Sequence, residues 1–157
     1  MSENPARQPL YEVFNDYFYR TNQIYHQTAR RLGLSDAEFT IFYLLDSGLE
    51  LTFSEIVLST CLPKQTVHSC LKKQLDLGLV HLSGEAQSRN RRYSLSEKGV
   101  SVIHPMLASV KEAEKKATDI FSPQQKDDFS EKIRQYLESL SRALADPEKP
   151  DRTREPD

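Results

Sequence analysis

Two helix-start patterns in the first half of the sequence constrain the fold more than any other feature. In a capping box, a serine or threonine caps the first turn of a helix, and a glutamate three residues later caps its backbone N–H in return. Ser35 with Glu38 and Thr52 with Glu55 have this form. A glycine or a proline follows each start closely, so both predicted helices are short.

A third short helix and a hairpin follow in the predicted order. Residues 64–77 form a helical stretch between Pro63 and Gly78, and a glycine there suits the left-handed turn that ends many helices. Residues 79–82 and 92–95 are strand candidates on either side of a polar turn that contains a glycine. Two helices joined by a tight connection and followed by a hairpin make a winged helix-turn-helix, whose second helix enters the major groove of DNA.

Long amphipathic helices are predicted on both sides of this region. Residues 10–32 contain neither proline nor glycine, and their apolar residues recur at helical spacing. Ser96 caps a second long helix, and Ser122 with Pro123 starts a third. The apolar stripes of these helices exceed what a winged-helix core of this size covers, so we expect a twofold homodimer.

The sequence thus predicts a mainly α fold with a small β-hairpin. Its segments are a flexible N-terminus (1–9), an N-terminal dimerisation helix (10–32), a winged helix-turn-helix region (33–99), C-terminal dimerisation helices (100–145) and a disordered tail (146–157). The tail is rich in charge and proline and has no apolar anchor. There is no apolar run long enough to span a membrane, no signal-peptide core and no disulfide framework, so we expect a cytoplasmic protein.

The positive charge is concentrated in the middle of the chain. The whole sequence has a formal net charge of −2, but residues 61–100 carry seven lysines and arginines against three acidic residues. A local basic patch matters more to a polyanionic partner than the overall charge does. We therefore expect double-stranded DNA to bind at the predicted third helix and the hairpin.

The predicted recognition helix has an apolar side and a polar side. Val67, Cys70 and Leu71 recur at helical spacing and form the buried side. The candidate DNA-binding residues of the other side are Lys64, Gln65, Thr66, His68, Ser69, Lys72 and Lys73. Glutamine pairs with adenine edges, threonine offers a hydroxyl and a methyl group, and the two later lysines suit phosphates. Taken alone, the same pattern also fits a solvated helix face.

Three arginines mark the predicted wing. Strand alternation turns Tyr93 and Leu95 toward the core and leaves Arg92 facing outward, while Arg89 and Arg91 lie at the tip. Arginines at a hairpin tip suit the minor groove, whose negative potential is strongest where the groove is narrow. The alternative is a solvated loop, which the neighbouring helix-turn-helix disfavours.

From Gly33 to Gly99 the sequence resembles the MarR family of bacterial winged-helix regulators. The resemblance rests on Thr66-Val67, on Gly78-Leu79-Val80, on the arginine-rich wing and on the stretch LSEKG at residues 95–99. It implies a dimeric transcriptional repressor with interlocked terminal helices and a near-palindromic operator. It also implies release from DNA by a small, often phenolic effector or by cysteine oxidation.

The sequence departs from the family pattern at four positions, one of which, Ser96 in place of threonine, serves equally well as a helix cap. Gln87 stands where the wing usually has an aspartate, Leu82 where an arginine is frequent, and Gln74 where a core leucine is usual. The missing aspartate leaves the wing arginines without an orienting partner, so we expect the wing to order only on DNA. Gln74 predicts a rotated or loosely packed last turn of the recognition helix.

Analogy with the family suggests an effector pocket where the first long helix meets the winged domain. The candidate residues are Tyr17, Tyr25, His26 and His104. An aromatic stripe at helical spacing is more often core than pocket, and that alternative stays open.

Other kinds of chemistry find little support in the sequence. Cys61 and Cys70 lie at the end of one predicted helix and on the buried side of the next, where a cysteine is commonly a small apolar residue. A redox-sensing regulator is therefore a minor alternative. The four histidines are not at metal-ligand spacing, and no catalytic motif is present, so we expect no metal, no cofactor and no enzyme. The other alternative is a winged-helix module that docks an acidic protein surface.

Overall fold

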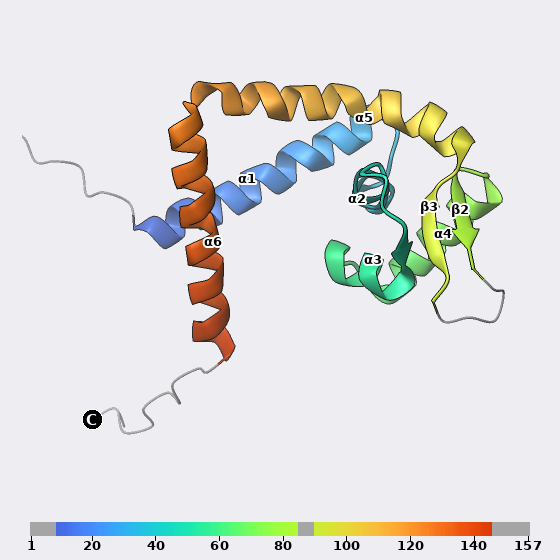
Figure 1. Cartoon of the computed structure of the whole chain (residues 1–157), viewed down its shortest axis with the longest axis horizontal. Helices are drawn as coiled ribbons and strands as arrows, with labels where there is room; N and C mark the ends of the chain where they lie inside the picture. The colour runs from blue at the N-terminus through green and yellow to red at the C-terminus, as the bar shows by residue number, and fades with distance from the viewer. Residues whose placement is uncertain (1–8, 85–89, 146–157) are drawn as a thin grey trace, which may run out of the picture. The chain divides into compact units, whose positions relative to one another are not determined.

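The computed structural model describes residues 9–84 and 90–145. These form α1 (Leu10–Arg31), α2 (Asp36–Leu45), β1 (Leu51–Thr52), α3 (Phe53–Thr60), α4 (Lys64–Asp76), β2 (Val80–Ser83), β3 (Arg92–Leu95), α5 (Glu97–Ala117), a 3₁₀ turn (Thr118–Ile120) and α6 (Pro123–Ala145) (Figure 1). The mainly α prediction is confirmed. The chain divides into two compact units, residues 1–109 and 110–157. The predictions of a flexible N-terminus and a disordered tail fall, apart from Pro9, outside the described residues.

Both predicted capping boxes form. The Ser35 hydroxyl accepts a hydrogen bond from the Glu38 backbone N–H at 3.3 Å, and the Glu38 carboxylate accepts one from the Ser35 N–H at 2.9 Å. Thr52 and Glu55 repeat the arrangement at the start of α3, with distances of 3.3 and 2.7 Å. Each box satisfies backbone N–H groups that a helix start otherwise leaves without a partner.

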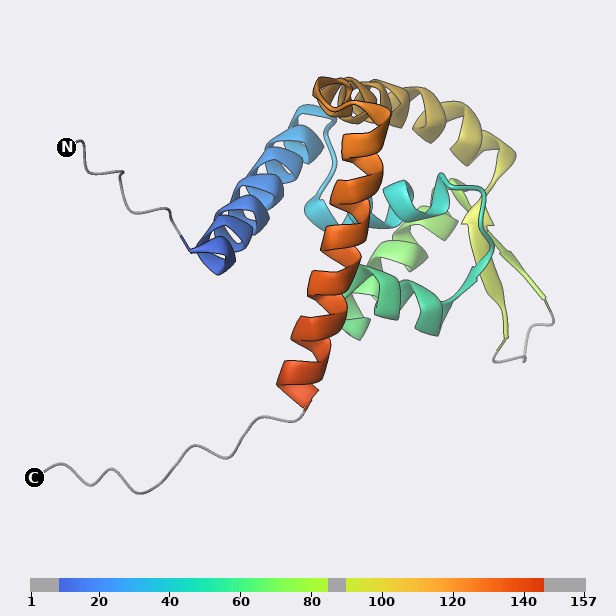
Figure 2. The same ribbon diagram turned by 60° about the vertical axis from the view of Figure 1, so that its left-hand side comes forward.

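The core of the first unit is built around α2, which contacts α1, α3, α4 and β3. The three short helices α2, α3 and α4 gather beside the sheet in both ribbon views (Figures 1 and 2). The largest fully buried apolar side chains are Ile41, Phe42, Leu45, Ile56, Val67, Leu71, Ile103 and Leu107. They come from four helices, α2, α3, α4 and α5, so this one core fixes the helix-turn-helix in place.

The sheet has three strands rather than the two of the predicted hairpin. Its order is β1-β3-β2, and both pairings are antiparallel, with Leu51 opposite Tyr93 and Val80 opposite Leu95. Strand β1 leaves no pattern in the sequence, because it has only two residues and its second residue, Thr52, also caps α3. The wing is therefore tied to α3 through β1.

The start of α5 docks against the turn that ends α4. Ser96 accepts a hydrogen bond from the Gly99 N–H at 2.9 Å, which confirms it as the predicted cap, and its hydroxyl donates to the Gly78 carbonyl at 2.6 Å. The Ser96 N–H donates to the Leu79 carbonyl at 3.0 Å. A Cβ on Gly99 would lie 1.9 Å from that same oxygen. The close approach explains why a glycine occupies this place in the stretch LSEKG.

In the second unit, α6 begins as predicted at Ser122 and Pro123. The Ser122 hydroxyl accepts from the Gln125 N–H at 3.3 Å, and the Gln125 side chain accepts from the Ser122 N–H at 2.8 Å. This is a capping box with glutamine in place of glutamate. Phe121 and Phe129 stack with ring centroids 5.8 Å apart, which holds the entry to the helix.

The two terminal helices leave their apolar stripes uncovered in the single chain. Of the residues of α1, only Ala29 is buried, and none of the residues of α6 is buried. The exposed large apolar side chains of these helices are Leu10, Tyr11, Val13, Tyr17, Phe18, Tyr19, Ile24, Phe129, Leu137, Leu140 and Leu144. A stripe of this length in water is typical of a surface that binds a partner.

Candidate nucleic-acid interface

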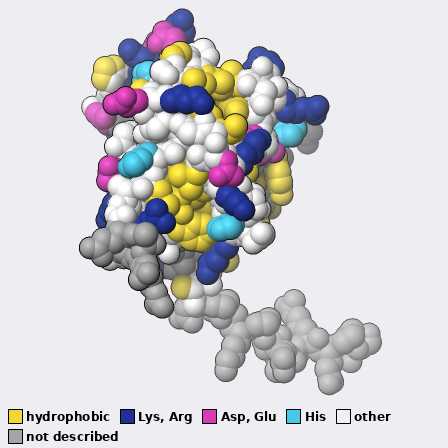
Figure 3. Space-filling view, turned by 90° about the vertical axis from the view of Figure 1, so that its right-hand side faces the viewer, with side chains coloured by type: hydrophobic (Ala, Val, Ile, Leu, Met, Phe, Trp, Pro, Cys, Tyr) yellow, Lys and Arg dark blue, Asp and Glu magenta, His cyan; other side chains and the backbone are white. Residues whose placement is uncertain are grey.

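The two sides of α4 lie as its sequence predicts. Val67, Cys70 and Leu71 are buried. On the other side Thr66 is half-buried, and the exposed residues are Lys64, Gln65, His68, Ser69, Lys72 and Lys73. On the face drawn in Figure 3, lysine, arginine and histidine side chains lie among apolar patches and several acidic side chains.

Two open hollows flank the exposed ridge of α4. One, of about 470 Å³, is lined by Ser35, Ala37, Glu38, Gln65, Thr66, Ser69, Cys70 and Lys73. The other, of about 460 Å³, is lined by Gln65, His68, Ser69, Lys72, Lys73, Asp76 and Leu77. Gln65, Ser69 and Lys73 line both hollows, so they stand on the ridge between them. A helix that projects in this way has the shape that enters a major groove.

Lys73 is engaged by an acidic residue of α2. Its ammonium donates to Glu38 Oε1 at 2.7 Å, which raises the pKa of Lys73. Partial burial acts to raise the pKa of Glu38, but the hydrogen bonds from Lys73 and Ser35 outweigh it and hold this pKa at about 2. The carboxylate is therefore ionised throughout the ordinary pH range, and Lys73 already has a counter-charge within the protein.

Gln74 is a core residue, and the predicted disturbance of the last turn of α4 is wrong. Gln74 is 2% exposed, and its Nε2 donates to Glu38 Oε1 at 2.9 Å. A buried amide is costly unless it is hydrogen-bonded. The bond to Glu38 satisfies the amide, so α4 continues as a regular helix to Asp76.

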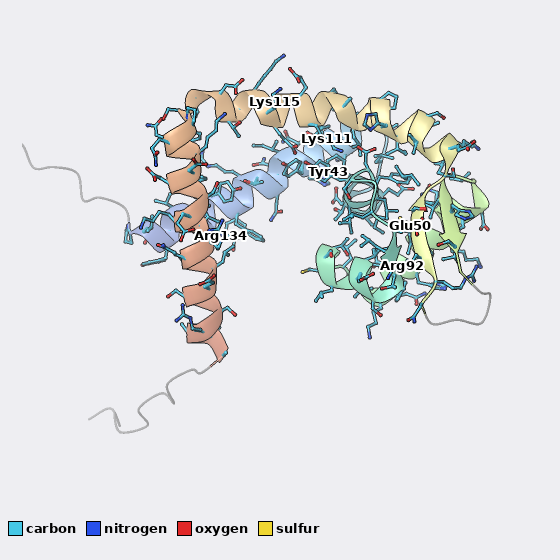
Figure 4. The ribbon with its side chains drawn as sticks, viewed as in Figure 1. Tyr43, Glu50, Arg92, Lys111, Lys115 and Arg134 are labelled. Atoms are coloured by element: carbon cyan, nitrogen blue, oxygen red, sulfur yellow. The ribbon has the colours of Figure 1, made fainter. Side chains whose placement is uncertain are left out.

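Arg92 braces the sheet as well as facing outward. Its Nη1 donates to the Glu50 carbonyl at 2.8 Å and lies 3.7 Å from the Glu55 carboxylate (Figure 4). Hydrogen bonds from Thr52 lower the pKa of Glu55, and the charge of Arg92 adds to the effect. The prediction that Arg92 faces outward is confirmed, because 47% of its side chain is exposed. The predicted alternation along the rest of β3 is not seen, because Tyr93, Ser94 and Leu95 are all half-buried. The contacts to the segment before α3 could not be seen in the sequence.

Of the other two wing arginines, only Arg91 lies among the residues that the structure describes. Arg91 is half-buried beside Gly84, where a Cβ would lie 3.5 Å from the Arg91 Cα. Its Nε is buried without a hydrogen-bond partner among the described residues. Arg89 and Gln87 lie outside the described residues, so the expected role of Arg89 and the predicted ordering of the wing stay predictions.

The structure does not bring the four candidate effector residues together in one hollow of the first unit. Tyr25 and His26 line a hollow of about 440 Å³ between α1 and α2, where His26 lies 2.9 Å from Asp36. His104 lies 3.1 Å from Asp46 and lines a different hollow, of about 380 Å³. Tyr17 is 60% exposed and lines neither. The sequence could not predict this separation, because helical spacing shows which residues share a face but not which element packs against that face.

The two cysteines are in different environments. Cys70 is 8% exposed, and burial raises the pKa of its thiol to about 11. Cys61 is exposed in the left-handed conformation that ends α3, with φ of 54°. Among the described residues, no group of histidines, cysteines or acidic residues is arranged to hold a metal ion. None of the described helices is both long and apolar enough to cross a membrane.

The helices α3 and α4, the hairpin of β2 and β3 that follows them, and the short strand β1 that precedes α3 and pairs with β3 define a winged helix-turn-helix fold. A solved MarR-family regulator from Neisseria meningitidis is similar with a TM-score of 0.75 and 20% identity over 88% of this chain and 98% of its own. S. aureus MepR, solved in complex with DNA, has a TM-score of 0.63 and 18% identity over 82% and 94%. S. aureus MarR, solved with salicylate and kanamycin, has a TM-score of 0.67 and 15% identity over 85% and 91%.

The chain therefore has the fold of MarR-family transcriptional regulators, as its sequence predicts. No family model matches the sequence. No curated protein matches it either.

Proposed function

We propose that this protein is a sequence-specific DNA-binding transcriptional regulator of the MarR type. The observation that carries the proposal is the exposed polar ridge of α4, flanked by two hollows and placed on the same compact unit as an arginine-bearing wing. The similarity to MepR, which was solved on DNA, supports the same use of the fold. The basic residues of the middle segment supply the charge that a phosphate backbone attracts.

The proposed contacts divide by chemistry. Gln65, Thr66 and Ser69 read base edges in the major groove, because amides and hydroxyls both donate and accept hydrogen bonds. Lys64, His68 and Lys72 contact bases or phosphates nearby, and Arg89 and Arg91 reach the minor groove. Lys73 and Arg92 are held by Glu38, Glu50 and Glu55, so their first role is within the protein.

We propose that the protein acts as a homodimer on a near-palindromic operator. The uncovered apolar stripes of α1 and α6 support this assembly, because a second copy would bury both. Twofold symmetry would place two α4 helices in successive major grooves about 10 bp apart.

Repression and release by an effector belong to the same proposal. A dimer seated on an operator excludes other proteins from it, which is the simplest route to repression. The structurally similar S. aureus MarR was solved with salicylate bound. In a second similar protein, Bordetella bronchiseptica BpsR, 6-hydroxynicotinic acid regulates DNA binding. An aromatic acid is therefore the class of effector to test first, and the hollow lined by Tyr25 and His26 is its candidate site.

Selection of bound sequences from random double-stranded DNA, followed by a footprint, tests the proposal. The expected result is one enriched motif with twofold symmetry and two protected half-sites about one helical turn apart. Enrichment of no motif, together with DNA binding that random competitor removes completely, would contradict a sequence-specific regulator.

A further inference from the structure

One acidic residue of α2 satisfies donors from two helices. Glu38 Oε2 accepts from the N–H and the hydroxyl of Ser35 at 2.9 and 2.8 Å. Glu38 Oε1 accepts from Lys73 Nζ and Gln74 Nε2 at 2.7 and 2.9 Å. An ionised carboxylate has about four acceptor sites, so every one is used. Its side chain is only 12% exposed, whereas Lys73 is 62% exposed.

Lys73 lies on the proposed DNA-binding side of α4, so its contact with Glu38 affects how the protein binds DNA. Lys73 follows Ser69 by one helical turn and Gln65 by two, and all three residues line the same hollow. A free lysine at this place would bind a phosphate whatever the base sequence. Such a contact raises the affinity for operator and random DNA alike and adds no discrimination.

We propose that Glu38 determines specificity by withholding Lys73 from the DNA phosphates, which keeps the affinity for random DNA low. This inference rests on the proposed DNA-binding function. The capping box fixes Glu38 at the start of α2, and the buried amide of Gln74 fixes the facing side of α4. The carboxylate is therefore held at the distance where it neutralises Lys73.

The substitution Glu38→Gln separates the electrostatic role of Glu38 from its structural role. Glutamine also completes a capping box, so its amide oxygen remains with Ser35. Its NH₂ group then faces α4. Gln74 can rotate its own amide and accept a hydrogen bond from that NH₂ group. The Lys73 ammonium carries only donors, so it cannot bond to the NH₂ group and is released.

The test is a double-mutant cycle on a random-sequence duplex. Affinities of the wild type, Glu38→Gln, Lys73→Met and the double variant are measured across a salt series, with thermal unfolding of each protein as the check of its fold. In the Glu38→Gln protein, Lys73→Met should make the slope of log affinity against log salt shallower by about 0.9. Between about 50 and about 200 mM salt, this difference in slope corresponds to roughly a 3.5-fold difference in affinity. In the wild type, Lys73→Met should change the slope by clearly less.

The other capping-box glutamate provides a matched control. Glu55 caps α3 and lies beside Arg92 rather than Lys73, so Lys73→Met should act in Glu55→Gln as it does in the wild type. An equal effect of Lys73→Met in the wild-type and Glu38→Gln proteins would overturn this inference alone. A wild-type protein that binds no DNA at any salt concentration would overturn the proposed function itself.

Discussion

At the scale of single residues, Glu38 links the stability of the fold to pH. Its pKa is about 2 in the folded protein, against an ordinary value of 4.5. A carboxyl whose pKa is depressed by folding stabilises the protein above the unfolded value, and this contribution disappears as the pH falls through the folded value.

We therefore expect the stability difference between wild type and Glu38→Gln to be largest above pH 4.5 and to shrink as the pH falls toward about 2. Urea unfolding at several pH values measures it. Glu97→Gln, at an exposed position of α5, controls for the loss of one charge. A difference that does not vary with pH would mean that the contacts of Glu38 do not depend on its charge.

The two thiols should differ in reactivity. Cys61 is exposed, whereas Cys70 is buried and the pKa of its thiol is about 11. Because the thiolate is the reactive form, a thiol reagent at pH 8 should modify the native protein at Cys61 and leave Cys70 unmodified until unfolding. Counting of modified thiols in Cys61→Ser and Cys70→Ser proteins assigns the sites. Rapid modification of Cys70 in the native protein would reopen the redox-sensing alternative.

At the scale of elements, the docking of α5 on the turn after α4 depends on one glycine. A Cβ on Gly99 would overlap the Leu79 carbonyl oxygen, which also accepts the hydrogen bond from Ser96. We expect Gly99→Ala to destabilise the fold by about 1–3 kcal/mol, the usual cost of forcing extra volume into a packed site. Chemical unfolding measures the loss, with Ser101→Ala, two residues along the same helix, as the control. Equal stabilities of the two variants would show that α5 can move away without cost.

The elements themselves were largely predictable, and the exceptions have physical causes. The capping boxes at Ser35 and Thr52 predicted the starts of α2 and α3 because their partners lie only three residues apart. Strand β1 escaped prediction because two residues carry no periodic pattern, and only its pairing with β3 defines it. The long helix predicted after Ser96 forms as α5 and continues through Pro105, with Ile103 and Leu107 buried on either side of the proline.

The candidate site was predictable in its faces but not in its partners. Helical periodicity separated the buried and exposed sides of α4 correctly. It could not show that Lys73 pairs with Glu38, 35 residues earlier, or that Arg92 bonds to the Glu50 carbonyl, 42 residues earlier. Contacts of that separation depend on tertiary packing, which leaves no local pattern in the sequence.

At the scale of the whole molecule, the terminal helices predict a dimer. Phe18 is 60% exposed on the apolar stripe of α1. We expect Phe18→Glu to weaken self-association by roughly tenfold or more, since a charge buried in an apolar interface is costly. Sedimentation over a range of concentrations measures this, and Asn15→Glu on the same helix is the control. A wild type that sediments as a monomer at micromolar concentration would contradict the proposed assembly.

The proposed regulator reads DNA sequence through the exposed ridge of α4. The most direct test is the ratio of affinities for the selected duplex and for random DNA at one salt concentration, measured for the wild type and for Gln65→Ala. For the wild type we predict a ratio on the order of 10³ or more. Gln65→Ala should cost about 1–3 kcal/mol on the selected duplex and almost nothing on random DNA. Equal affinities of the wild type for both duplexes, or an unchanged ratio for Gln65→Ala, would contradict the claim.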